Sequence, residues 1–352
     1  MKQRGLICGC AFFMLLFASS IQAAEIRQGD LDASGVIDSA DMVILANYMA
    51  GNLLTIPAQF GQLYELDPLV GTLRLVPSGI FVQGSPLDEP CRAEHEAQFS
   101  HTLTLDIAVM ETEVTRQMWA DLKALQTTLP TDPTNTGYGS GMTNPLQSVT
   151  WYEAVLFANL LSLQRGLTRC YYTNAGFTTP ITSSNYTTGP FYCNWNADGY
   201  RLPTEGEWEY FCRAGTTGAF SVVEPNYSSG NCGSYITTPG TWPFVESVAW
   251  FCANRYDTAG NNKTKPVATK APNPAGFYDV HGNVYEMCWD WYGSYPTGAA
   301  IDFRGSETGT DRVVRGGCWH DYILQCRSAH RTTTAPDGRG FNCGFRLVRT
   351  VL

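Results

Sequence analysis

The fold of this chain is indicated most strongly by one stretch, Gly276-Phe277-Tyr278-Asp279-Val280-His281-Gly282-Asn283-Val284-Tyr285-Glu286-Met287. It holds two carboxylates, Asp279 and Glu286, seven positions apart around a Gly-Asn turn. Oxygen ligands spaced in this way can converge on a hard cation, so we favour a calcium site here. The alternative is a polar tight turn in which Glu286 accepts hydrogen bonds from backbone amides.

The composition of the chain narrows its class. Its 352 residues are 44% hydrophobic and 16% charged, with 34 Gly and 19 Pro, which excludes a disordered, collagenous or coiled-coil protein. So many turn-forming residues predict short elements in an irregular, loop-rich α+β domain. The formal net charge is -9, and an acidic surface repels phosphate backbones, so we expect no nucleic-acid partner.

The first 24 residues are typical of a secretory signal peptide. Lys2 and Arg4 precede an apolar stretch, and Ala23-Ala24 offers small residues for cleavage. The apolar stretch is too short for a comfortable membrane span and no other is long enough, so we expect a secreted or periplasmic protein. Ile7-Cys8-Gly9-Cys10 superficially resembles a lipoprotein box, but it lies before the apolar run, which favours ordinary cleavage.

A calcium-loop pattern follows the leader, within residues 25–52. Oxygen side chains fall at loop positions 1, 3, 5 and 12, Gly35 allows a sharp turn, and Val36 is placed to offer a carbonyl; the predicted ligands are Asp30, Asp32, Ser34, Val36 and Asp41. The segment resembles one repeat of a dockerin domain, which normally carries two and would suit attachment to an extracellular assembly. The alternative is an acidic turn ahead of a helix. Residues 53–74 are interpreted as a linker.

Three helices are predicted from their N-terminal signals. Thr150 and Glu153 form a capping box that begins a helix ending near Gln164, and Thr204 and Glu207 form a second box for a helix through Arg213. Thr115 caps a third helix, from residue 116 to about 126. The rest of the main domain is predicted to consist of short strands and loops.

The cysteine count favours disulfides. Cys8 and Cys10 lie in the leader, which leaves ten of the 12 cysteines, an even number without any CxxC pair. Aromatic, strand-like residues flank a polar excursion between Cys170 and Cys193. We therefore predict a hairpin closed by a Cys170–Cys193 disulfide.

Several motifs, in this order along residues 75–350, resemble the formylglycine-generating enzyme (sulfatase-modifying factor) superfamily. They include the opening strand 75–85, the segments 200–210 and 276–287, and the closing segments 312–319, 326–331 and 344–348. The resemblance implies a disulfide-stabilised, C-type-lectin-like fold with calcium held by Asp279, Gly282, Val284 and Glu286. We interpret the family's framework residues as buried ion-pair and capping partners; they are Arg201, Glu205, Trp208, Glu209, Asn283, Glu286, Arg315, Arg327, Arg331 and Arg346.

The chain departs from the family at the catalytic site. Enzymes of the family hold copper with two cysteines a few residues beyond an Arg-Gly-Gly motif, and two thiolates suit Cu(I). Here Asp321 stands where the first copper cysteine is expected, and the second has no counterpart. Cys318 could replace a copper ligand together with Cys326 or His320, but these are weak candidates. A disulfide explains the presence of Cys318 better. The histidines also lack the spacing of an iron site.

Two functions remain open from the sequence. One is a formylglycine-generating oxidase that uses copper and oxygen on a sulfatase peptide. The other, which we favour, is a lectin-like binding module for a protein or glycan ligand. It would present residues 319–325 and 332–341, with Trp319, His320, Asp321 and Tyr322 as ligand contacts.

Overall fold

The computed structural model describes residues 60–187, 189–225, 227–232, 238–256 and 263–352. The predicted signal peptide, the dockerin-like calcium loop and part of the predicted linker lie outside the described residues, so these remain predictions. Within the described part of the chain, no helix is long and apolar enough to cross a membrane.

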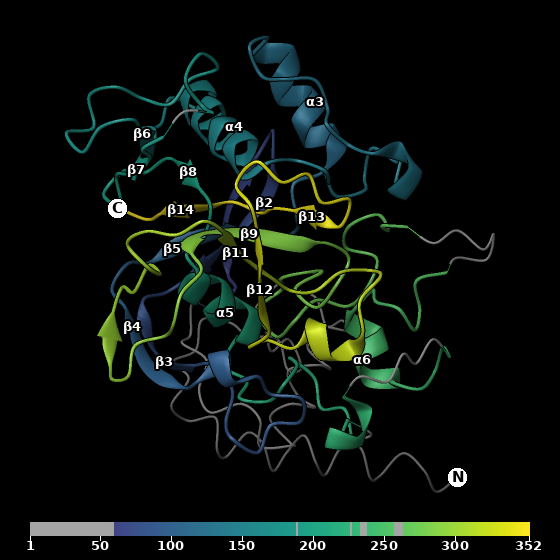
Figure 1. Cartoon of the computed structure of the whole chain (residues 1–352). Coiled ribbons are helices and arrows are strands. Elements are labelled where there is room, and N and C mark those ends of the chain that lie inside the picture. The colour runs from purple at the N-terminus through teal and green to yellow at the C-terminus, as the bar shows by residue number, and fades with distance from the viewer. Residues whose placement is uncertain (1–59, 188, 226, 233–237, 257–262) are drawn as a thin grey trace, which may run out of the picture.

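Two sheets occupy the centre of the molecule (Figure 1). The larger sheet is antiparallel throughout, with the order β1 (Leu63–Asp67), β2 (Gly71–Val76), β5 (Ile107–Met110), β14 (Val348–Thr350) and β8 (Tyr200–Arg201). The second sheet has the order β12 (Arg331–Thr334), β11 (Arg312–Arg315), β9 (Tyr285–Trp291) and β13 (Cys343–Gly344), with β13 parallel to β9. Two smaller sheets consist of β10 (Ala300–Ile301), β4 (Phe99–Leu103) and β3 (Gly79–Gln83), and of β6 (Tyr171–Tyr172) and β7 (Tyr192–Cys193).

The three predicted helices are confirmed as α3 (Arg116–Leu125), α4 (Trp151–Gln164) and α5 (Glu205–Arg213). Each begins at the predicted threonine, whose hydroxyl accepts a hydrogen bond from the third helical amide. In Figure 1, α3 and α4 lie above the central strands, and α5 lies below them against β9 and β11. A short helix that the sequence did not predict, α6 (Pro243–Val248), begins with proline in its first turn.

Single 3₁₀ turns punctuate the loops between these elements. They are η1 (Glu94–Glu96), η2 (Thr136–Tyr138), η3 (Ser229–Asn231) and η4 (Ile323–Cys326). Together with the short strands they agree with the irregular α+β architecture expected from the content of Gly and Pro.

The folded domain begins earlier than the predicted boundary at residue 75. The segment interpreted as linker contributes β1 and most of β2, which form an antiparallel hairpin on the edge of the larger sheet. Asp67 caps the turn between them by accepting hydrogen bonds from the amides of Leu69 and Val70. The error arose because β1 is exposed along most of its length and so lacks a clear alternation of apolar and polar residues.

The stretch 276–287 is held from several directions. The Asn283 side chain accepts a hydrogen bond from the amide of Lys265, and its backbone carbonyl accepts one from Trp319. Gly282 has a φ of +124°, and a Cβ there would collide with the carbonyl of Trp250. The turn therefore needs glycine at position 282. Through the hydrogen bond from Trp319 to Asn283, the turn also positions the segment after Gly317.

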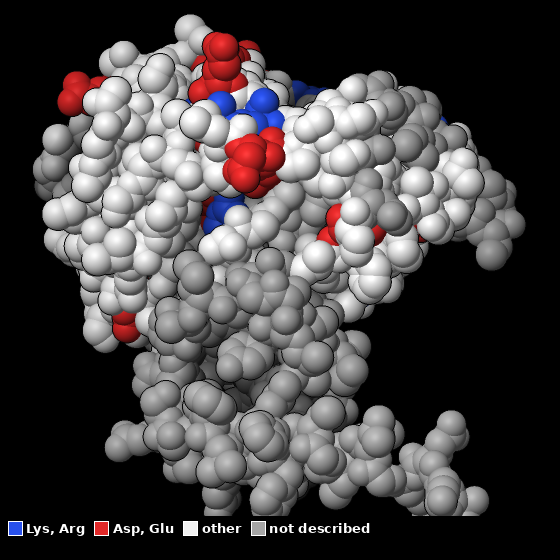
Figure 2. All heavy atoms as spheres, turned by 90° about the horizontal axis from the view of Figure 1, so that it is seen from below, with Lys and Arg blue, Asp and Glu red and all other residues white. Residues whose placement is uncertain are grey.

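The predicted buried ion pairs are confirmed. Arg346 binds Glu286 through Nε and Nη2, both at 2.6 Å, while Trp208 Nε1 donates to the same carboxylate at 2.8 Å. Four further buried arginines form ion pairs with buried carboxylates: Arg201–Glu207, Arg315–Glu209, Arg327–Glu96 and Arg331–Glu205. The domain therefore buries several complete ion pairs. On the face shown in Figure 2, most of the exposed charged side chains gather in one group of both signs.

The cysteines differ in part from expectation. The β6–β7 hairpin forms as predicted, but Cys170 and Cys193 are separate buried thiols in this structure. Among the described residues a disulfide joins Cys91 to Cys232, which are 141 residues apart. Local sequence patterns reveal hairpin partners but not partners brought together by long loops, which explains why this bond was missed.

We expect the Glu286–Arg346 pair to be among the most important ion pairs for stability. Arg346→Met leaves a buried carboxylate without its cation and should lower the free energy of unfolding by about 3–5 kcal/mol. The control is Arg116→Met, because the Arg116–Asp132 pair is partly exposed and should contribute at most about 1 kcal/mol. Urea unfolding followed by circular dichroism measures both, and equal small losses would contradict this view of the core.

Candidate functional site

A hollow of about 300 Å³ opens over the second sheet. Every strand of that sheet contributes to its lining: Tyr285 comes from β9, Val314 from β11, Thr332–Thr334 from β12 and Cys343 from β13. Loop residues Asp321, Gly340 and Asn342 complete it. The volume lies at the lower end of the range for small-ligand sites in proteins.

Asp321 is the lining residue with a negative charge. Its Oδ2 accepts a hydrogen bond from the amide of Cys318 at 3.1 Å, and the Tyr285 hydroxyl and the Cys318 thiol also hydrogen-bond to this carboxylate. Burial raises the pKa of Asp321 above its ordinary value, and these hydrogen bonds oppose that rise. The result is a carboxylate fixed in position at the wall of the hollow.

The structure brings together only part of the predicted contact surface. Asp321 lines the hollow, and Thr332–Thr334 belong to the predicted segment 332–341. Trp319 is 1% exposed, and it packs beside the stacked pair Tyr138 and Phe341, so it supports the loop instead of facing a ligand. His320 is exposed and Tyr322 is half-buried, but neither lines the hollow.

The sequence analysis missed four lining residues, Tyr285, Val314, Asn342 and Cys343. Tyr285 was quoted only as part of the calcium stretch, and Asn342 lies one position beyond the predicted segment. A signal for Tyr285 was available, since residues alternate between the two faces of a strand and its neighbour Glu286 was expected to be buried. No local signal indicated Asn342, because its place depends on the pairing of β13 with β9.

The thiols near the site are poor metal ligands. Burial raises the pKa of Cys343 to about 12 and raises the pKa values of Cys318 and Cys326 well above the ordinary value. Metal binding and nucleophilic attack require the thiolate. Only Cys343 of these three lines the hollow, and among the described residues no group of three or more His, Cys, Asp and Glu side chains could hold a metal ion. The weak catalytic candidates Cys318, Cys326 and His320 do not line the hollow.

At the predicted calcium turn, the oxygens that are free to bind a cation differ from the predicted ligands. Glu286 cannot serve as predicted without giving up contacts, because both of its oxygens accept hydrogen bonds from Arg346 and Trp208. Asp279 Oδ1 is buried without a partner, and so are both carboxylate oxygens of Glu113. Burial raises the pKa of Asp279 to about 6, and burial with the nearby charges of Asp279 and Glu286 raises the pKa of Glu113 well above its ordinary value. Unpaired oxygens on two interacting carboxylates fit a hard cation.

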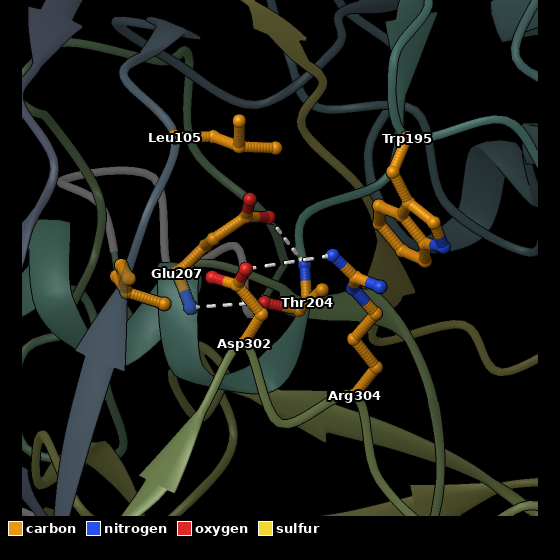
Figure 3. A pocket seen from close by; sticks show the side chains of 7 residues that line it. Leu105, Trp195, Thr204, Glu207, Asp302 and Arg304 are labelled. Atoms are coloured by element: carbon orange, nitrogen blue, oxygen red, sulfur yellow. Dashed lines mark hydrogen bonds and ion pairs between the residues drawn. The ribbon is translucent and has the colours of Figure 1, made fainter.

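A second hollow, of about 10 Å³, lies beside Trp195 (Figure 3). Its polar residues bind one another: Glu207 and Thr204 form the capping box of α5, and Arg304 lies 3.8 Å from Asp302 and over the Trp195 ring. With so little space and its polar groups paired internally, it is not the candidate site.

Comparison with known proteins agrees with the architecture. Residues 67–351 match the Sulfatase-modifying factor enzyme 1-like domain. The chaperone protein LppX of Paenibacillus barcinonensis is 29% identical over 256 residues, which cover 70% of this chain and 80% of that protein. The formylglycine-generating enzyme of Thermomonospora curvata is 35% identical over 177 residues, which cover 48% of this chain and 55% of the enzyme. The chain thus spans about half the length of this enzyme.

Solved structures are also similar. Treponema denticola variable protein 1 superposes with a TM-score of 0.63 at 27% identity, covering 82% of this chain and 99% of that one. PvdO from Pseudomonas aeruginosa gives a TM-score of 0.61 at 25% identity, covering 83% and 99%.

The raised pKa values predict unreactive thiols. Iodoacetamide at neutral pH should leave Cys318, Cys326 and Cys343 unlabelled in the native protein and label them after denaturation with reductant. Mass mapping measures this, and the same experiment without reductant tests the predicted Cys170–Cys193 disulfide. Rapid labelling of Cys318 together with its neighbours, prevented by Cu(I), would instead show a copper-binding thiol pair.

Proposed function

The chain belongs to the sulfatase-modifying factor enzyme 1-like family, and from this premise we propose that it is a non-catalytic, lectin-like recognition module that binds a polypeptide in the hollow of the second sheet. The observation that carries the proposal is Asp321. A carboxylate stands where the family resemblance places a copper cysteine, and it is held there by Tyr285 and Cys318.

The surrounding chemistry supports binding over oxidation. A copper oxidase needs two soft thiolates at one point, whereas the nearest thiols are buried and protonated and the charged group that lines the hollow is a hard carboxylate. Among the described residues, the expected copper-binding cysteine pair of the formylglycine-generating alternative is therefore not found.

A polypeptide suits the shape of the site. β12 is an edge strand of the second sheet, and its threonines line the hollow, so an extended segment could lie along it with side chains entering alternately. The similarity to a protein named as a chaperone points to the same class of ligand.

Export and calcium belong to the same proposal. The leader at residues 1–24 would direct the chain to a secreted or periplasmic location, where the loop with Asp30, Asp32, Ser34, Val36 and Asp41 would bind calcium and offer attachment to an assembly. A second calcium ion would be held by Asp279 and Glu113, with the carbonyls of Gly282 and Val284 as further predicted ligands. Its role would be to neutralise two buried carboxylates.

Selection from a displayed random-peptide library tests the binding function. Peptides that bind the natural chain should lose at least about tenfold in affinity with Asn342→Trp, because the indole fills the hollow. A matched substitution on an exposed helix position outside it, Gln117→Trp, should leave affinity unchanged. A sulfatase-type peptide incubated with Cu(I) and oxygen should yield no formylglycine. Enrichment of no peptide, with binding to glycans instead, would replace the polypeptide by a carbohydrate ligand.

Calcium should stabilise the domain through Asp279 and Glu113. A ligand that binds only the folded state at about 100 times its Kd adds about 2.7 kcal/mol, which calorimetry detects as a higher Tm in calcium than in EDTA. Glu113→Gln should remove most of that shift in a chain lacking residues 1–59, which isolates this site from the N-terminal loop. An unchanged shift in this variant would assign the calcium to other residues.

A further inference from the structure

We propose that the hollow selects a positively charged side chain, lysine or arginine, of the polypeptide that it binds. This inference rests on the proposed function, since it names the chemistry of the group that enters the same site. It is carried by the geometry around Asp321 and by the absence of an opposing charge on the residues that line the hollow.

Asp321 has several hydrogen-bond partners but no ion-pair partner among the described residues; the neighbouring His320, which favours its charged form, lies outside the lining of the hollow. Its known partners are a backbone amide, a tyrosine hydroxyl and a thiol, all of them neutral. Other buried carboxylates of the domain, such as Glu207 and Glu286, bind an arginine in a two-pronged pair. Asp321 takes part in no ion pair within the described part of the chain.

The remaining lining residues can accept hydrogen bonds from a cation. Asn342 donates a hydrogen bond from Nδ2 to the Cys318 sulfur at 3.6 Å. Its side-chain oxygen is left as an acceptor. The hydroxyls of Thr332 and Thr334 are further acceptors, and Tyr285, Val314 and Cys343 carry no positive charge. An arginine or ammonium group carries only donors, so acceptors around a single carboxylate match it in both charge and hydrogen bonding.

The segment that carries Gly340 and Asn342 is supported by aromatic packing. Phe341, which precedes Asn342, stacks on Tyr138 with ring centroids 4.3 Å apart. Both rings are half-buried and lie outside the lining of the hollow, so they support the segment that carries Gly340 and Asn342. A carboxylate ligand would meet the negative charge of Asp321 at close range, and no Lys, Arg or His lines the hollow to compensate for it.

The test uses blocked tripeptides, acetyl-Gly-Xaa-Gly-amide, in which Xaa is arginine, lysine, citrulline, norleucine or glutamate. Citrulline has nearly the shape of arginine without its charge. Affinities come from NMR titration of the full mature chain, with resonances of Thr332–Thr334 reporting the hollow. The arginine peptide should bind at least about tenfold more tightly than the citrulline peptide.

The variant Asp321→Asn should bind the two peptides with equal affinity, because it preserves shape and removes charge. The matched control is Asp337→Asn, an exposed carboxylate on the following loop that does not line the hollow, and it should keep the preference. Circular dichroism confirms that the variants are folded. If Asp321→Asn fails to fold, the salt dependence of the natural chain decides, since only the arginine peptide should lose affinity as salt rises.

The outcomes separate this inference from the function on which it rests. Equal binding of arginine and citrulline peptides in the hollow, or preference for glutamate, would overturn charge selection and leave polypeptide recognition standing. If neither these peptides nor library-selected ones perturb the hollow, the proposed function itself is wrong.

Discussion

The buried pair of Glu286 and Arg346 is the contact on which the rest of the domain depends. The carboxylate also accepts Trp208 Nε1 from α5, and the guanidinium donates to the carbonyls of Met110, Glu111 and Tyr278. A buried pair is stable only when each donor and acceptor finds a partner, so this one forms only when β5, α5, β9 and the closing segment are all in place. The family motifs thus contain residues that contact one another in the folded domain. This is why the motifs predict the fold so well.

Sequence reasoning succeeded where the decisive interaction is local. The capping boxes at Thr115, Thr150 and Thr204 lie within four residues of the amides that they satisfy, so the helices followed from short patterns. The β1–β2 hairpin and the Cys91–Cys232 bond depend on residues far apart or on strands with little alternation, and they were missed. The arginine–glutamate partners were identified as a group only through the resemblance, because no single pairing can be read from spacing.

The same limit explains the partial prediction of the site. Asp321 was identified from the sequence because a carboxylate in place of a thiolate changes the chemistry of the site in any conformation of the loop. Which neighbours face a ligand depends on how the loop turns, and this is set by Cys318 binding Asp321 and by Trp319 packing beside Tyr138 and Phe341. A large side chain on a predicted recognition loop can therefore hold the loop in place instead of contacting a ligand. Trp319 is such a side chain.

The pleat of the second sheet explains how such a site can change while the fold stays fixed. Side chains alternate between the faces of a strand, so Tyr285 and Val314 face the hollow while the adjacent Glu286 and Arg315 form ion pairs on the other side. On β12, Arg331 pairs with Glu205 and the next residue, Thr332, lines the hollow. A substitution at a hollow position leaves the charged framework intact. Asp321 lies on the loop after β11, outside these strands, so its side chain can also differ without disturbing the ion pairs.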